Sequence, residues 1–155
     1  MNVMIWNRKM SVGLDELDVD HKELIRIINQ LGAGSGEESR RTAVRQSLVA
    51  LQRYAEYHFA REESVMRACG YPELDEHQGQ HRSFIQRIQD LTRRFDADPE
   101  AVAEVVNENL LSFLQGWLSH HIMIEDKAYG PHIENNPKAK KAAKSFQASQ
   151  IWWSG

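Results

Sequence analysis

Seven residues of the types that bind metal ions occur along this chain at spacings that suit helices. In chain order they are His21, His58, Glu62, His77, His81, His121 and Asp126. Imidazole and carboxylate together suit iron or manganese, and paired sites of this kind are built in the cores of helical bundles. One histidine pair would be weak evidence, but seven candidates spread over four helical segments predict a carboxylate-bridged metal site.

Other metal chemistries fit the sequence less well. Cys69 is the only cysteine, which argues against a structural zinc site or an iron-sulfur cluster. Gln78 follows His77 where the His-Glu-x-x-His motif of zinc proteases needs a glutamate. The chain also has no Glu-x-x-His pair, whereas the ferritin-like di-iron proteins use two of them. A site dominated by imidazole is therefore predicted.

Four segments have the hydrophobic periodicity of amphipathic helices and would position these residues. They run from about Val19 to Leu31, from about Glu38 to Cys69, along a stripe from Leu74 to Phe95, and from an Asp98-Pro99-Glu100 start to Gly130-Pro131. Short connections after the second and third helices make consecutive helices antiparallel neighbours. The predicted fold class is all-α, an up-down-up-down antiparallel four-helix bundle with an N-terminal arm and a C-terminal extension.

The candidate ligands fall on the inner faces of these helices. His58 with Glu62, and His77 with His81, lie four residues apart on apolar stripes of neighbouring helices. A buried imidazole or carboxylate without a partner costs on the order of 1 to 3 kcal/mol. One such histidine alone is more often a satisfied core or surface residue, but the two pairs together favour metal binding.

Three neighbouring polar residues are predicted to lie outside the site. Glu56 and Glu63 lie off the inner stripe of their helix and are expected to form salt bridges on the surface. His120 precedes a candidate ligand but is turned by about 100° from it, so it is expected on the helix surface or between helices.

Asp126 has an unusual spacing for a ligand. It follows His121 by five residues, which is about 140° round an ideal helix. Glu125, four residues after His121, would be the simpler choice. A π-like turn or a local rotation is predicted to bring Asp126 to the site.

Length and composition set the broad class of the chain. Its 155 residues fit one domain, with the bundle expected over residues 1–134 and an extension over 135–155. A net charge of -3 gives no general attraction for nucleic acid. The single cysteine favours a reducing compartment, and neither a signal peptide nor a transmembrane segment is recognisable, so a cytoplasmic location is expected.

The extension combines lysines with aromatic residues at its end. These residues are Lys138, Lys140, Lys141, Lys144, Phe146, Ile151, Trp152 and Trp153. Our first interpretation is a short helix that packs the aromatic residues onto the bundle. Docking to a partner, weak attachment to an anionic membrane surface, and an expression remnant are the alternatives.

From about Trp6 to Tyr129 the sequence resembles the bacterial hemerythrins, non-haem di-iron proteins that bind oxygen. The matching segments are Ser11-Val-Gly-Leu-Asp-Glu-Leu-Asp-Val-Asp-His21, His58-Phe59 with Glu62, His77 with His81, and Trp117-Leu118-x-x-His121-Ile122 with Asp126 and Tyr129. The resemblance implies that one iron is held by His77, His81 and His121, the other by His21 and His58, and that Glu62, Asp126 and a hydroxide or oxide bridge them. It also implies an open position for dioxygen on the second iron.

The resemblance further implies an apolar pocket over the open position, which would exclude water and anions that promote irreversible oxidation. The residues placed to line it are Phe59, Trp117, Leu118 and Ile122. The expected function is reversible, non-enzymatic binding of dioxygen for storage, delivery or sensing, with an oxidase or another oxygen-using protein as a possible recipient. The alternative is a di-iron enzyme or iron-handling protein acting on nitric oxide or peroxide. The inner stripes offer no spare carboxylate as a proton donor, which favours the carrier.

Overall fold

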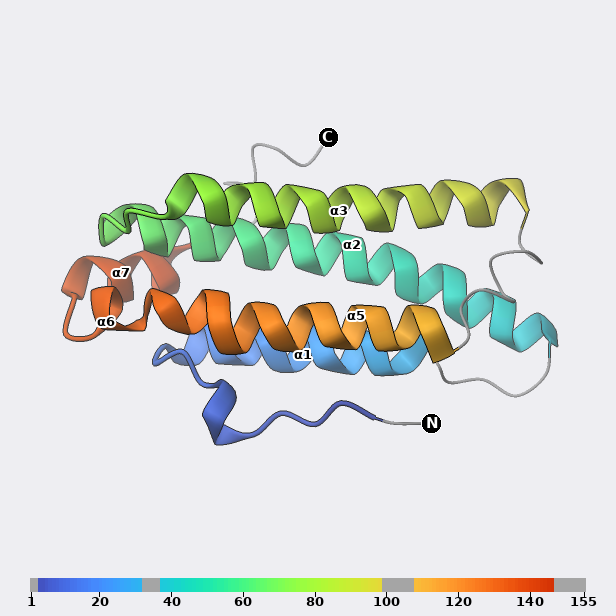
Figure 1. The fold of residues 1–155 in the computed structure, drawn as a ribbon, viewed down its shortest axis with the longest axis horizontal. Coiled ribbons are helices and arrows are strands. Elements are labelled where there is room, and N and C mark those ends of the chain that lie inside the picture. The colour runs from blue at the N-terminus through green and yellow to red at the C-terminus, as the bar shows by residue number, and fades with distance from the viewer. Residues whose placement is uncertain (1–2, 32–36, 99–107, 147–155) are drawn as a thin grey trace.

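The structure is a computed structural model that describes residues 3–31, 37–98 and 108–146, with the backbone alone for 37–41, 43 and 108–111. Its elements are η1 (Arg8–Met10), α1 (Asp15–Leu31), α2 (Glu37–Ala68), α3 (Leu74–Ala97), α5 (Glu108–His120), the π-helical turn η2 (His121–Asp126), α6 (Gly130–Ile133) and α7 (Pro137–Ser145). α1, α2, α3 and α5 run alternately in opposite directions along one long axis (Figure 1). The predicted all-α antiparallel four-helix bundle is confirmed.

The helix boundaries agree with the hydrophobic pattern except at the start of α1. This helix begins at Asp15, one turn before the predicted start at Val19. Acidic residues in a first turn stabilise a helix N-terminus, and Asp18 also accepts a hydrogen bond from the backbone N–H of Val12 at 2.9 Å. This carboxylate joins the N-terminal arm to the helix, which explains the earlier start. The predicted start of the fourth helix at Pro99-Glu100 lies outside the described residues.

The core has an apolar cluster on each side of a polar layer. The larger cluster lies on one side of this layer and includes Leu24, Ile28, Leu48, Leu51, Phe84, Ile88, Leu114 and Leu118. The smaller cluster lies where α6 and α7 meet the bundle and includes Leu17, Val65, Met66, Tyr129, Ile133, Ala139 and Ala143. His21 on α1 and Glu62 on α2 each fall in sequence between members of the two clusters, so the polar layer is enclosed along the bundle axis by apolar side chains.

The C-terminal segment returns to the bundle as a short helix. Asn136 caps α7 by accepting hydrogen bonds from the backbone N–H groups of Lys138 and Ala139, at 3.0 and 3.2 Å. α7 packs against α1 and α2, burying Ala143 and the following Phe146 while its lysines are exposed. The predicted packing of the terminal residues 151–153 lies outside the described residues.

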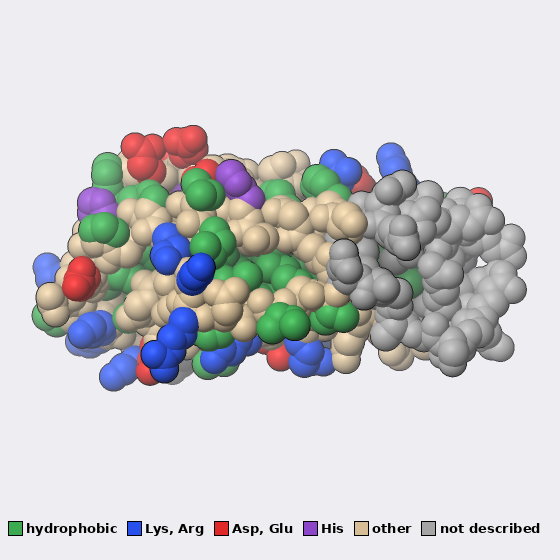
Figure 2. Space-filling view, turned by 60° about the horizontal axis from the view of Figure 1, so that its bottom comes forward, with side chains coloured by type: hydrophobic (Ala, Val, Ile, Leu, Met, Phe, Trp, Pro, Cys, Tyr) green, Lys and Arg blue, Asp and Glu red, His purple; other side chains and the backbone are tan. Residues whose placement is uncertain are grey.

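The surface carries scattered apolar side chains among charged ones. Figure 2 shows one face on which hydrophobic side chains lie between lysines and arginines. Exposed apolar residues in the described part of the chain include Val3, Ile5, Phe113 and Ile124. Single side chains of this kind are normal on folded proteins. Among the described helices, none combines the length and apolar character that crossing a lipid bilayer requires.

Candidate metal centre

The structure brings all seven predicted ligand residues together in the polar layer of the bundle. α1 contributes one residue, α2 and α3 contribute two each, and η2 contributes two. They are His21, His58, Glu62, His77, His81, His121 and Asp126, and each is at most 3% exposed. They form two neighbouring groups that share the two carboxylates.

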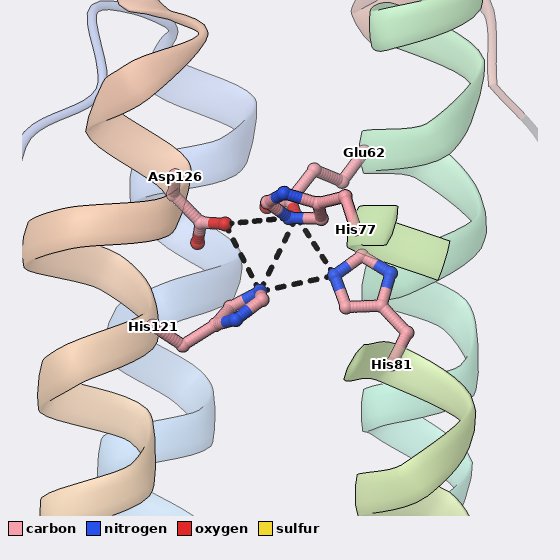
Figure 3. A group of neighbouring side chains, drawn as sticks. All are labelled: Glu62, His77, His81, His121 and Asp126. Carbon is pink, nitrogen blue, oxygen red and sulfur yellow. Dashed lines mark hydrogen bonds and ion pairs between the residues drawn. The ribbon is translucent and has the colours of Figure 1, made fainter. Parts of the chain in front are cut away.

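The first group contains the histidines of α3 and the histidine of η2 (Figure 3). Oε1 of Glu62 lies 2.7 Å from Nε2 of His77 and 3.0 Å from Nε2 of His81. Oδ1 of Asp126 lies 3.0 Å from Nε2 of both His77 and His121. The Nε2 atoms of His81 and His121 are 3.0 Å apart. Three imidazole nitrogens and one oxygen from each carboxylate therefore gather around one position.

The second group uses the other oxygen of each carboxylate. Oε2 of Glu62 lies 3.1 Å from Nε2 of His58 and 3.6 Å from Nε2 of His21. Oδ2 of Asp126 lies 3.0 Å from Nε2 of His21. Because each carboxylate directs one oxygen into each group, the two residues have the arrangement of bridging ligands between two positions.

Unpaired polar atoms in this cluster fit a bound cation. Among the described residues, Nε2 of His21, Nε2 of His58 and both carboxylate oxygens of Asp126 are buried without a hydrogen-bond partner, although they lie close to one another. A buried polar group without a partner is destabilising, and metal coordination satisfies it. Imidazole and carboxylate donors are also the set that iron accepts. The residues present therefore fit metal ions at both positions.

The pKa values of the clustered imidazoles and carboxylates also indicate a site that favours cations. Burial lowers the pKa values of His21 and His77, but the carboxylates of Asp126 and Glu62 outweigh it and raise each to about 10. Burial and Glu62 raise the pKa of Asp126, yet His121 and His21 outweigh them and hold it below its usual range. The carboxylates therefore favour positive charge on the imidazole side of the cluster. A metal cation would satisfy the same carboxylates and would compete with protons for the imidazole nitrogens.

Asp126 reaches the cluster because residues 121–126 form a π-helical turn. In this wider turn the hydrogen-bonded positions are five residues apart, so His121 and Asp126 point to the same side. This confirms the predicted local change of helix geometry. Glu125 instead lies 3.8 Å from Nε2 of His120, whose side chain is 66% exposed, so the predicted surface position of His120 is also confirmed.

Two carboxylates behind the imidazoles were not found from the sequence. Oε2 of Glu63 lies 2.9 Å from Nδ1 of His81, and its Oε1 accepts a hydrogen bond from Gln78 at 2.8 Å. Oδ2 of Asp20 lies 3.1 Å from Nδ1 of His58. Such partners fix the orientation and tautomer of a ligating histidine.

The predicted surface position of Glu63 is therefore wrong, and so is that of Glu56. Glu63 is 5% exposed because it faces α3 rather than solvent, and Glu56 is 9% exposed and accepts a hydrogen bond from Gln52 at 3.1 Å. The pattern along α2 alone does not indicate this position, because the contacts of Glu63 with Gln78 and His81 depend on how α2 faces α3.

The four residues predicted to line a pocket lie against the cluster or in the adjoining core. Phe59 stacks on His81 with ring centroids 3.8 Å apart, and Trp117 stacks on His121 at 4.6 Å. Leu118 and Ile122 are buried in the larger apolar cluster beside them. Aromatic rings therefore cover His81 and His121 on the side that faces the larger apolar cluster.

An all-helical bundle whose polar layer consists of imidazoles and carboxylates defines a class, the helical-bundle metal-binding proteins. Within that class, the family model "Hemerythrin HHE cation binding domain" matches residues 12–133. The chain therefore belongs to the hemerythrin family, in which the cation is non-haem iron.

Individual relatives and solved structures agree with the family. The chain is 30% identical over 134 residues to a bacteriohemerythrin of Stenotrophomonas maltophilia, covering 86% of this chain and 84% of the relative. A bacteriohemerythrin of Methylococcus capsulatus is 30% identical over 132 residues, covering 84% and 97%. A wild-type hemerythrin crystal structure is 30% identical and superimposes with a TM-score of 0.73, covering 85% of this chain and 98% of that structure.

Proposed function

We propose that this chain binds dioxygen reversibly at a di-iron centre held by its seven buried ligand residues. The observation that carries the proposal is the division of the carboxylate oxygens, one from Glu62 and one from Asp126 in each group. Two carboxylates placed in this way suit a pair of ions better than a single one. Family membership supports iron as the metal and dioxygen as the ligand.

The two proposed iron positions differ in their protein donors. One iron is assigned to His77, His81 and His121, and the other to His21 and His58, with Glu62, Asp126 and a hydroxide or oxide as bridges. The position formed by His21 and His58 has one imidazole fewer, so an iron held there would have room for an external ligand. When two ferrous irons occupy the site, they supply the electrons that reversible dioxygen binding requires.

The remaining residues of the site act on its shape, hydration and hydrogen bonds. We assign Phe59, Trp117, Leu118 and Ile122 to an apolar cover that excludes water and anions from the bound ligand. The ring of Phe59 reaches both proposed iron positions, since its centroid lies 3.8 Å from that of His81 and 5.7 Å from that of His58. The Tyr129 hydroxyl donates a hydrogen bond to Oε2 of Glu62 at 3.1 Å. Burial and the nearby carboxylates raise the pKa of Tyr129 well above its usual value, so this hydroxyl stays protonated and holds the carboxylate in place.

A carrier without enzymatic activity is supported by how the acidic groups near the site are used. Glu63 and Asp20 both face imidazole Nδ1 atoms, and Glu62 and Asp126 are assigned to the irons. Each of these carboxylates already has a partner, and none is placed as a proton donor for reduction of nitric oxide or peroxide. The carrier would store dioxygen, signal its level, or deliver it to an oxidase or another oxygen-using protein.

Oxygen stoichiometry tests this proposal. The anaerobically reduced, iron-loaded chain is titrated with dioxygen, and the oxygen taken up is compared with that released under vacuum. The proposal predicts one dioxygen taken up and released for each pair of irons. Continued consumption of nitric oxide or peroxide with an electron donor, without release of dioxygen, would assign an enzyme instead.

A further inference from the structure

Asp20 is a buried carboxylate beside the proposed centre that is not one of its seven ligands. Its side chain is 2% exposed, and its Oδ2 lies 3.1 Å from Nδ1 of His58. An ionised carboxylate only accepts hydrogen bonds, so the His58 ring donates from Nδ1. Nε2 of His58, the atom that faces Glu62, then keeps its lone pair for a metal.

The other oxygen of Asp20 is bound to an arginine that is held on several sides. Oδ1 of Asp20 accepts hydrogen bonds from the Tyr54 hydroxyl at 3.0 Å and from Nη1 of Arg61 at 3.2 Å. Nη1 of Arg61 also donates to the backbone carbonyl of Glu16 at 3.2 Å, and Nη2 donates to the Tyr57 hydroxyl. The Arg61 side chain is only 13% exposed, so its charge balances Asp20 away from bulk water.

The C-terminal extension covers this arginine. The ring of Phe146, which directly follows α7, lies 5.9 Å from the guanidinium carbon of Arg61. The same ring meets the ring of Tyr57 edge to face at 5.5 Å, and the Arg61 guanidinium lies 4.8 Å over that tyrosine. Phe146 is 7% exposed and lies beyond residue 133, where the match to the family domain ends.

We propose that the C-terminal extension supports the metal position formed by His21 and His58, through Phe146, Arg61 and Asp20. Phe146 holds the guanidinium, Arg61 holds and neutralises Asp20, and Asp20 fixes the tautomer and ring orientation of His58. Asp20 is thus a positioning residue rather than a ligand. This inference rests on the proposed di-iron function.

The other metal position has a separate support. Glu63 holds Nδ1 of His81 and is itself held by Gln78, and both partners lie on α3. This pair is made between α2 and α3 without the extension. Loss of the extension's contacts is therefore expected to weaken iron binding at His21 and His58 and to leave iron binding at His77, His81 and His121 unchanged.

The two proposed iron positions can be distinguished by how strongly each retains ferrous iron against a chelator under anaerobic conditions. Ferrous iron is loaded into the full chain, a chelator is added in graded amounts, and the iron remaining per chain is counted. The variants Asp20→Asn and Phe146→Ala are compared with Leu48→Ala, which removes a buried side chain of the larger apolar cluster outside the C-terminal extension. Circular dichroism establishes that each variant is folded, and Phe146→Ala decides the test if Asp20→Asn does not fold.

We expect Asp20→Asn and Phe146→Ala to lower the affinity for one iron by about 10-fold to 100-fold, the usual effect of removing a partner of a metal ligand. The iron assigned to His77, His81 and His121 should be retained as in the wild type, and Leu48→Ala should lower the melting temperature without changing either affinity. Wild-type retention in either variant, equal loss of both irons, or the same iron loss in the control would overturn the inference. A wild-type chain that binds fewer than two irons would instead refute the proposed function.

Discussion

Replacement of Leu118 by alanine tests whether the apolar cover protects the proposed oxygen site. Leu118 is 2% exposed and belongs to the larger apolar cluster together with Phe59 and Ile122. Truncation of a buried leucine costs about 2 to 5 kcal/mol. In a chain of this size each kcal/mol lowers the melting temperature by about 2 to 4 °C. The cavity also opens a path for water to the bound ligand, so oxidation to the ferric state should accelerate without loss of iron.

Leu114→Ala provides the matched control for this prediction. Leu114 lies on the same helix one turn earlier, is 0% exposed, and is not one of the predicted pocket residues. Both variants should lose similar stability in thermal unfolding followed by circular dichroism. The rate of conversion to the ferric form in air, followed by absorbance, should rise in Leu118→Ala and stay near the wild-type rate in Leu114→Ala. Equal rates in the two variants would refute the protective role.

Three further predictions concern the ligands, their supports and the C-terminal segment. His58→Ala and His81→Ala should each lower the iron content measured by metal analysis, whereas His120→Ala should not; full loading of both ligand variants would remove the proposed site. Glu63→Gln should lower the affinity for one iron by about 10-fold to 100-fold in a chelator competition, and unchanged affinity would make its contact with the imidazole incidental. Deletion of residues 146–155 should lower the melting temperature because the segment begins with a buried phenylalanine; an unchanged value would mean that this contact does not stabilise the bundle.

The fold and the ligand cluster could be predicted because both follow from local periodicity. His58 and Glu62 share the stripe of Leu51 and Val65, and that stripe must face the core whatever the neighbouring helices are. The π-helical turn was predictable for a similar reason. Asp126 stands five residues from His121, and a regular helix could not place both side chains on one side.

The supports of the ligands could not be predicted because they depend on how helices face one another. Glu63 lies off the inner stripe of α2, and only the packing against α3 shows that it faces His81. Asp20 likewise meets His58 across the contact between α1 and α2. The division of the chain into residues 1–134 and 135–155 stays a prediction.

The optical spectrum of the anaerobically reduced protein tests the central claim most directly. The diferrous chain should be nearly colourless, develop visible absorption when dioxygen is admitted, and lose it when dioxygen is removed, through repeated cycles. Oxidation in a single turnover, with no spectrum that reverts and with catalytic consumption of nitric oxide or peroxide, would contradict reversible dioxygen binding.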